Sequence, residues 1–193
     1  MIRIAIDADV PAMLAIYAPY VQNTTVSFEY AVPTAEEFLR RFQTVTAQFP
    51  WLVWEEDSRI LGYAYAAAPF ERAAFRWCAE PSIYLLPEAQ GRGIAAKLYT
   101  ALETLLQLQG YQVMYALITE ENLPSVRFHE KCGYHTCTVF PDCGFKFGRW
   151  LGLRWMEKRL EFVRSPSAPP LSWLSIVQDA ERFTNILDSL SLS

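Results

Sequence analysis

The chain has 193 residues, of which 52% are hydrophobic and 20% are charged, and its net charge is −4. These values suit one globular domain, and an acidic balance disfavours a general binder of nucleic acids or anionic membranes. No apolar run approaches the roughly 20 residues that span a bilayer, and the N-terminus lacks the long apolar core of a signal peptide. We therefore expect a folded cytoplasmic protein with neither nucleic acid nor membrane as a partner.

Few side chains are available for a metal site, because the chain has only four cysteines and two histidines. The cysteines lie at positions 78, 132, 137 and 143 and form no C-x-x-C pair, the spacing typical of zinc sites. In a protein without a secretion signal such cysteines are usually reduced thiols. The sequence therefore predicts no metal and no disulfide framework.

The chain begins with a strand and a helix. Residues 2–6 alternate between isoleucine and other residues, which is typical of a strand. The apolar spacing of residues 10–21 predicts a helix that either Asp7 or Asp9 can cap. Residues 23–30 break this pattern and are rich in hydroxyl and β-branched side chains, so we expect an extended loop there.

A second helix and three strands follow. Thr34 and Glu37 fit a capping box that opens the helix. Residues 51–54 and 60–68 flank a polar turn and predict a hairpin. The next strand extends to Leu86 and contains a proline at position 81. Because proline cannot donate to a strand ladder, this residue indicates a bulge or a splayed edge.

The middle of the chain carries a strand, a glycine loop and a helix. Residues 83–86 are apolar and end at Pro87, and Gln90-Gly-Arg-Gly93 forms the turn. Apolar residues from Ile94 onward then recur at helical spacing up to Gly110. The N-terminus of such a helix has unpaired N–H groups and the positive end of a dipole, which together attract anions. We expect this loop to hold a pyrophosphate.

The last part of the domain is predicted as a strand at 113–118, a short helix and a pair of strands. Asn122 can cap the helix, which stops at Gly133. Apolar and polar residues alternate between 134 and 160, with a predicted turn at 141–144.

A composition shift after Leu160 separates a tail from this domain. Residues 165–170 read as a Pro/Ser linker, and residues 173–190 show the spacing of an amphipathic helix. We therefore divide the chain into a domain at 1–160 and a tail at 161–193.

The glycine loop alone is weak evidence, since an ordinary strand-to-helix turn can contain two glycines. The P-loop pattern is absent, and Ala96 replaces the third glycine of the dinucleotide fingerprint. The order of elements is more informative, and together with Gln90 to Ala95 it resembles the GNAT superfamily of acetyl-CoA-dependent N-acetyltransferases. Within it, the chain is similar to the phosphinothricin and methionine sulfoximine acetyltransferase branch, through four stretches at 17–29, 76–84, 125–134 and 144–150.

The resemblance implies an α/β (α+β) GNAT fold. Its sheet would be mixed, mostly antiparallel and seven-stranded, splayed at the cofactor strand and flanked by about four helices, with a C-terminal helical tail added. It also implies that acetyl-CoA is bound by the glycine loop, by the backbone of the preceding strand and by the start of the later short helix. The implied cofactor contacts are Ile83, Tyr84, Leu85, Gln90, Gly91, Arg92, Gly93, Ile94, Ala95, Ala96, Asn122 and Ser125.

Acetyl transfer needs a neutral amine, stabilisation of an oxyanion and a proton for the leaving thiolate. Glu80 matches the catalytic glutamate of the branch and would take the amine proton directly or through a water; the alternative is a solvated strand carboxylate. The N–H of Leu85 is a candidate oxyanion donor. His129 stands where many members of the superfamily place a tyrosine as thiolate acid, and a purely structural role is an equal alternative.

The resemblance also suggests residues for the acceptor amine. Arg72 and Phe75 match positions that bind the carboxylate end of an amino acid, which suits a bidentate guanidinium. Lys146 and Arg149 add positive charge, or are a solvated strand face. Phe75 stands where tyrosine is common, and loop 70–74 is one residue shorter than in herbicide-detoxifying members, so phosphinothricin itself is in question.

We therefore expect an enzyme that acetylates the primary amine of a small amino-acid-like substrate of the phosphinothricin or methionine sulfoximine type. Transfer would be direct, in a ternary complex, because no cysteine occupies the motif positions. The alternatives are a non-catalytic acyl-CoA-binding module and a protein-lysine acetyltransferase. The resemblance implies a homodimer.

Overall fold

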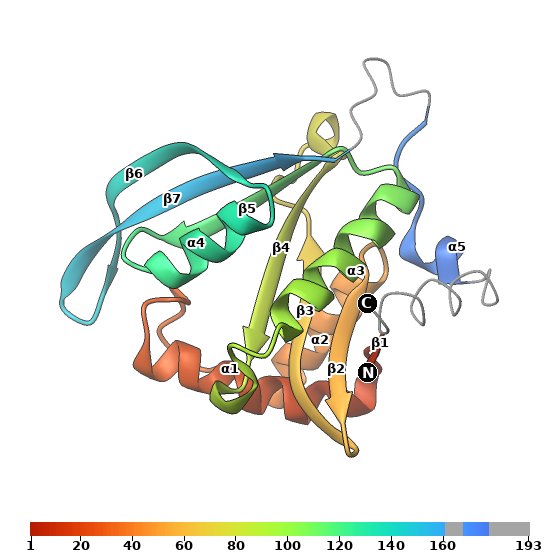
Figure 1. The fold of residues 1–193 in the computed structure, drawn as a ribbon, viewed down its shortest axis with the longest axis horizontal. Helices are drawn as coiled ribbons and strands as arrows, with labels where there is room; N and C mark the ends of the chain where they lie inside the picture. The colour runs from red at the N-terminus through yellow and green to blue at the C-terminus, as the bar shows by residue number, and fades with distance from the viewer. Residues whose placement is uncertain (161–167, 178–193) are drawn as a thin grey trace.

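A seven-stranded sheet with helices on both faces forms the body of the protein (Figure 1). The computed structural model describes residues 1–160 and 168–177. The strands are β1 (Ile2–Ile4), β2 (Trp51–Glu56), β3 (Arg59–Ala67), β4 (Cys78–Leu85), β5 (Val113–Thr119), β6 (His135–Lys146) and β7 (Arg149–Arg159). The α-helices are α1 (Val10–Asn23), α2 (Ala35–Thr46), α3 (Ile94–Gln109), α4 (Leu123–Lys131) and α5 (Trp173–Val177). This architecture confirms the predicted fold class.

The sheet opens between its two central strands. Its order is β1-β2-β3-β4-β5-β7-β6, and every neighbouring pair is antiparallel except β4 and β5. These two parallel strands pair only at Cys78–Ala79 and then separate. The N–H of Leu86 bonds to Leu61 of β3, so alternate residues such as Pro81 turn their backbone away from β3 and toward the gap. The missing N–H of Pro81 therefore costs no ladder bond, and the predicted splay is present.

The sheet separates two apolar clusters. One face carries the side chains that pack against α3, which crosses the front of the sheet in Figure 1, and α4 lies on the same side beside β5. The other face packs against α1 and α2 and is unusually aromatic. Because side chains alternate along a strand, Glu80, Ser82 and Tyr84 share the α1–α2 face of β4, and their neighbours point toward α3. Tyr84 packs on Tyr17 of α1 with ring centroids 4.9 Å apart, which fixes this assignment.

Two predicted helix caps form and one does not. The Thr34 hydroxyl accepts a hydrogen bond from the N–H of Glu37 at 3.1 Å, and the Asn122 side chain accepts one from the N–H of Ser125 at 3.3 Å. At α1 neither predicted acid caps the helix with its side chain. The Asp9 carboxylate instead binds the guanidinium of Arg3, because a charged partner at 2.7 Å is the stronger attraction.

The turn of the last hairpin lies later than predicted. β6 runs through residues 141–144 as an irregular stretch, and the chain reverses at Phe147 and Gly148. Both residues have positive φ, 51° and 75°, which suits a two-residue turn that matches the twist of the strands. The Pro141 segment has the composition of a turn without forming one, because bulges and turns favour the same residues.

The described part of the tail packs on its own domain. Trp173 is buried in the α3-side cluster, and its N–H bonds to the carbonyl of Gln48. The Gln109 side chain donates to the Gln48 and Leu171 carbonyls at 2.8 and 2.9 Å. The helix predicted at 173–190 is observed over residues 173–177, and its remainder lies outside the described residues. No helix in the described ranges combines the length and apolarity needed to cross a membrane.

Candidate active site

The glycine loop presents backbone amides at the start of α3. Gly91 and Gly93 have φ of 72° and 79°, a region that side chains disfavour, and an added Cβ at either would meet no atom within 4 Å. The helical bonding of α3 starts with Lys97 donating to the Gly93 carbonyl. The preceding amides therefore have no partner within the helix, and the space where side chains would stand at the two glycines is open. This geometry suits a bound anion.

Two polar side chains of the loop are already engaged. Arg92 makes an ion pair with Glu56 of β2 at 2.8 Å, which lowers the pKa of that carboxyl. The Gln90 side-chain amide lies 3.3 Å from the hydroxyl of Tyr20 on α1. The charge of Arg92 is therefore shared at the rim of the loop, and an incoming pyrophosphate would compete with Glu56 for it.

The gap between β4 and β5 forms a cavity that brings residues from four elements together. It is walled by β4, β5, α4 and the tyrosine of α3 at position 99. The predicted site residues that line it are Glu80, Ile83, Tyr84, Asn122, Ser125 and His129. Because Glu80 comes from the α1–α2 face and Tyr99 from the α3–α4 face, the cavity connects the two sides of the sheet. A ligand at the glycine loop and a second ligand behind β4 can therefore meet here.

Glu80 is the only carboxylate among the described residues that line this cavity. It is half-buried, and this burial raises the pKa of Glu80 above its usual 4.5. The raised pKa of Glu80 lies nearer to neutral pH. A carboxylate with such a pKa is a better proton acceptor. Its position on the strand that leads to the glycine loop is the one expected of a general base.

His129 is held as a neutral imidazole. Its Nδ1 lies 2.8 Å from the carbonyl oxygen of Ser125, which can only accept, so Nδ1 carries the proton. Nε2 is then the acceptor for the Tyr99 hydroxyl at 2.8 Å. Burial lowers the pKa of His129, although the Ser125 carbonyl opposes this. Neither nitrogen of this imidazole offers a free proton to the cavity.

Tyr99 and Tyr20 are polar groups of the site that sequence reasoning missed. The Tyr99 side chain is fully buried, and this burial raises the pKa of its hydroxyl well above 10. The Tyr20 hydroxyl donates to the carbonyl of Leu85 at 2.6 Å and lies 3.4 Å from the N–H of Leu85, the predicted oxyanion donor. Both tyrosines lie within helices with an apolar spacing, and this spacing does not distinguish a tyrosine of the site from an ordinary core residue.

Lys146 and Arg149 are placed differently from the prediction. Lys146 is 2% exposed, and its ammonium donates to the carbonyls of Val21, Thr24 and Ser27 at 2.6 to 2.9 Å. All three of its N–H donors are thus used by the last turn of α1 and the segment after it, which makes this residue part of the scaffold. Arg149 forms a bidentate pair with Glu121 at 2.7 Å on the surface.

Arg72 and Phe75 lie apart from Glu80 in this chain. They line a separate surface pocket beside the tail, which also includes Pro169 and Pro170. Phe75 is 43% exposed and packs on Phe70 with ring centroids 4.6 Å apart. The assignment of both residues to the acceptor amine stays a prediction.

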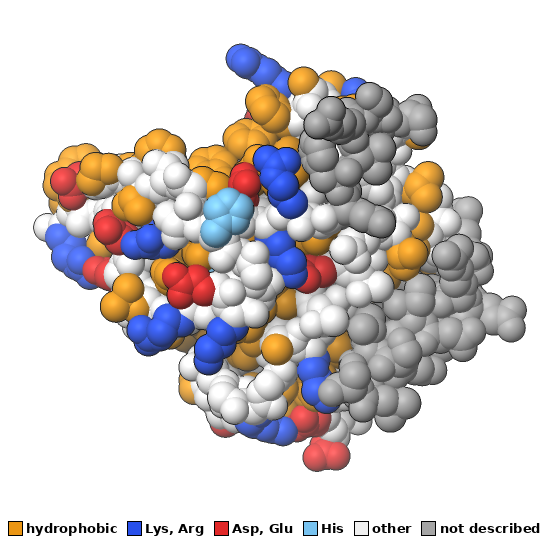
Figure 2. Space-filling model, turned by 45° about the horizontal axis from the view of Figure 1, so that its top comes forward, with side chains coloured by type: hydrophobic (Ala, Val, Ile, Leu, Met, Phe, Trp, Pro, Cys, Tyr) orange, Lys and Arg blue, Asp and Glu red, His pale blue; other side chains and the backbone are white. Residues whose placement is uncertain are grey.

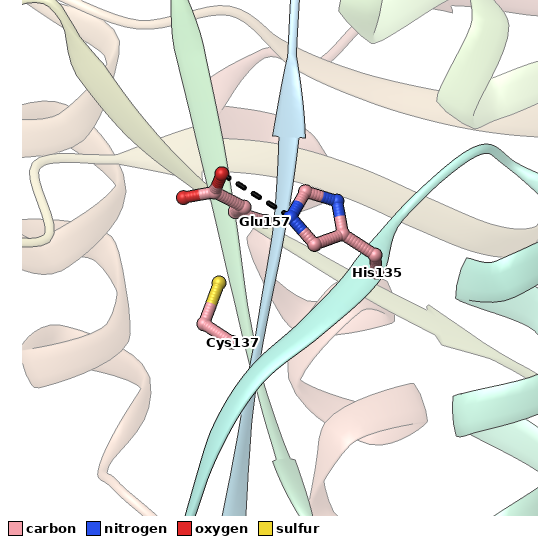
Figure 3. Close-up of side chains that lie close together, drawn as sticks. All are labelled: His135, Cys137 and Glu157. Carbon is pink, nitrogen blue, oxygen red and sulfur yellow. Dashed lines mark ion pairs between the residues drawn. The ribbon is translucent and has the colours of Figure 1, made fainter.

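A cluster of possible metal ligands lies on the two outermost strands. His135 and Cys137 of β6 point toward Glu157 of β7 (Figure 3), and their ligand atoms lie within 4.8 Å of one another. The same carboxylate oxygen of Glu157 is 3.3 Å from His135 Nε2 and 3.6 Å from the guanidinium Nε of Arg159. Because this carboxylate already has a cationic partner in Arg159, we assign the cluster no metal.

Comparisons with known proteins agree on one family. The model of the acetyltransferase (GNAT) domain matches residues 2–155. A phosphinothricin N-acetyltransferase of Alcaligenes faecalis is 36% identical over 82% of this chain and 82% of its own length. An L-methionine sulfoximine/L-methionine sulfone acetyltransferase of Pseudomonas aeruginosa is also 36% identical, over 85% and 96%. The crystal structure of a phosphinothricin acetyltransferase from Sinorhizobium meliloti in complex with AcCoA superposes with a TM-score of 0.81 and 33% identity, covering 88% and 92%.

Proposed function

Since this chain belongs to the GNAT family of acetyltransferases, we propose that it transfers the acetyl group of acetyl-CoA to the primary amine of a small amino-acid-like substrate, with Glu80 as the general base. The observation that carries this proposal is the cavity between β4 and β5, which is lined by Glu80 and by Ile83 and Tyr84 further along β4 toward the glycine loop. The related enzymes act on phosphinothricin and methionine sulfoximine, which supports an amino-acid-like acceptor.

Acetyl-CoA would lie on the α3–α4 side of the sheet. The open amides of the glycine loop suit its pyrophosphate, and the backbone of β4 from Ile83 to Leu85 borders the gap into which its arm would extend. Asn122 and Ser125 stand at the start of α4 on the far wall of the same cavity. The acceptor amine would enter from the α1–α2 side, where the carboxylate of Glu80 faces it.

The proposed proton movements follow from the protonation states of Glu80 and Tyr99. Glu80, as a carboxylate, takes a proton from the amine or from a bridging water, which leaves nitrogen a lone pair for attack on the acetyl carbonyl. A thiol has a pKa near 8.5, and burial raises the pKa of Tyr99 well above 10, so Tyr99 would keep its proton. Its hydroxyl donates to His129 Nε2 in this structure and would turn from His129 to the leaving thiolate to stabilise it by a hydrogen bond. We give His129 the role of positioning Tyr99, since its proton is directed at a backbone carbonyl.

A surface feature supports the proposal of a homodimer. Four aromatic side chains on the β6–β7 hairpin are 44% to 59% exposed, namely Phe140, Phe145, Phe147 and Trp150. In Figure 2 hydrophobic side chains run along the upper edge of the drawn face, from the left end toward the centre, with acidic and basic groups interspersed below them. Exposed aromatic groups of this kind are typical of interfaces between proteins.

Replacement of the base is the test of the proposed function. Glu80→Gln keeps the shape of the side chain and removes its basicity, so kcat/KM should fall by about 100-fold or more, and acetyl-CoA binding should persist. Release of free thiol with a panel of amino acids and sulfoximine analogues measures the rate, and calorimetry measures cofactor binding. Tight acetyl-CoA binding without thiol release for any amine would favour a binding module instead.

The pH profile of the native enzyme adds a second readout. The base must be deprotonated, so kcat/KM should fall as pH drops through the pKa of Glu80. Because burial raises this pKa, the fall should begin at a higher pH than for an ordinary carboxyl of pKa 4.5. Turnover by Glu80→Gln equal to that of the native enzyme would remove Glu80 from the role of base.

A further inference from the structure

A second cavity lies on the α1–α2 face of the sheet, beneath helix α2. Its volume is about 400 Å³, which is within the range of ligand pockets. Its floor is formed by β2, β3 and β4, and its walls are formed by α1, α2 and the segment between them. Six of its lining side chains are aromatic: Tyr17, Phe38, Trp51, Tyr63, Tyr65 and Tyr84.

This aromatic cavity opens beside the proposed base. Ala67 of β3 lines it and is the direct cross-strand partner of Glu80 on β4. Opposite residues of an antiparallel pair point to the same face and have Cβ atoms about 5 Å apart. Tyr84 lines both this cavity and the one between β4 and β5. An amine held at Glu80 therefore has the aromatic cavity as the adjacent space for its side chain, and the methyl group of Ala67 leaves the entrance wide.

The walls of the cavity suit a flat apolar group. The rings of Trp51 and Tyr65 are stacked with centroids 3.9 Å apart and an angle of 11° between them. The indole N–H of Trp51 is buried and has no hydrogen-bond partner among the described residues. The charged groups at the wall are Glu29, Arg40 and Arg41, of which Glu29 and Arg41 pair with each other at 2.6 Å. The cavity therefore offers mainly aromatic side chains, and Arg40 is the lining charge beyond the Glu29–Arg41 pair.

We propose that this aromatic cavity binds the side chain of the acceptor, and that the preferred acceptor is a primary amine with an aromatic side chain. The proposal rests on the proposed function, in that Glu80 must face the amine. An aryl group gains both burial and offset stacking in such a site, whereas a strongly polar side chain would lose its water against six aromatic rings.

The test narrows the entrance and measures binding and turnover separately. Ala67→Leu fills the space opposite Glu80, and Thr44→Leu narrows the cavity from α2, where Thr44 lines it. Ala15→Leu, the same change as at Ala67 made on the exposed side of α1, is the matched control. The probes are phenylalanine, tyrosine, methionine sulfoximine and alanine, titrated by calorimetry into the CoA-bound protein and assayed for thiol release with acetyl-CoA.

We expect the native protein and Ala15→Leu to prefer phenylalanine and tyrosine over alanine by about ten-fold or more, in binding and in kcat/KM. Ala67→Leu should reduce this preference by about ten-fold, and Thr44→Leu should reduce it less. Equal binding of aromatic and small amines by the native protein, or a preference untouched by both narrowing variants, would overturn the proposal even where turnover is normal. Absence of thiol release with every amine would count against the proposed function, while the binding data would still decide the role of the cavity.

Discussion

The two faces of strand β4 carry opposite kinds of side chain. Toward α3 it presents small and aliphatic groups such as Ala79, Pro81 and Leu85, which are packed into the α3-side cluster or border the gap. Toward α1 and α2 it presents Glu80 and Tyr84, beside an aromatic cavity. In the proposed function, the cofactor would bind on the first side mostly through backbone amides of the glycine loop, and the acceptor would bind on the second side through side chains.

This difference teaches where the two substrates are selected. A pyrophosphate has the same shape whatever amine is acetylated, so a loop of glycines with fixed φ is sufficient for it. An acceptor amine must be told apart from similar amines, and only side-chain shape and chemistry can do that. Change on the α1–α2 face should therefore alter substrate choice, and change on the α3 face should alter cofactor binding. The following predictions test this division, beginning with the largest effect.

Lys146 supports the α1–α2 side of the sheet, from which the acceptor amine would enter. Lys146→Met should reduce the free energy of unfolding by about 3 kcal/mol, because three backbone carbonyls lose their donor. Denaturant unfolding followed by fluorescence measures this loss. Arg149→Met is the matched control, and it should change stability little, since its pair with Glu121 is exposed. If both variants weaken substrate binding and neither affects unfolding, the lysine belongs to the substrate site after all.

The hydroxyl of Tyr99 should act on the chemical step. Tyr99→Phe removes the donor proposed for the leaving thiolate, so kcat should fall by about ten-fold to 100-fold while the KM for acetyl-CoA changes little. Tyr134→Phe is the control, because Tyr134 is buried in the same cluster and does not line the cavity between β4 and β5. Steady-state kinetics of the two variants compares them. An equal effect in both would indicate a role in packing alone.

The glycine loop should affect the cofactor and leave amine selection unchanged. Gly93→Ala places a side chain at a φ of 79°, and this strain should weaken acetyl-CoA binding by about five-fold. Gly110→Ala introduces the same kind of strain at the other end of α3, where φ is 94°, and should lower stability without affecting the cofactor. Calorimetric titration with acetyl-CoA distinguishes the two. A changed preference among amines in Gly93→Ala would break the proposed division between the faces.

Local patterns were enough to predict most of the elements. Helices α2 and α4 were located by their capping residues, and the splay of the sheet was indicated by Pro81. The pattern failed at the β6–β7 turn, where positive φ at Phe147 carries no sequence signal because phenylalanine rarely adopts it. Of the predicted site, six residues share one cavity, whereas Lys146 is scaffold and Arg72 lies in another pocket.

The sequence by itself determined the family, because the glycine loop and the order of elements are properties of consecutive residues. Only the tertiary structure decided which polar groups share a cavity. Tyr99 and His129 are 30 positions apart in the chain and share a hydrogen bond. Ala67 of β3 lies opposite Glu80 on the neighbouring strand β4. The charge of a lysine or the ring of a tyrosine is visible in the sequence, but its partners are not. Whether such a group binds a substrate, holds a loop or fills a core depends on contacts between segments that are distant in the chain.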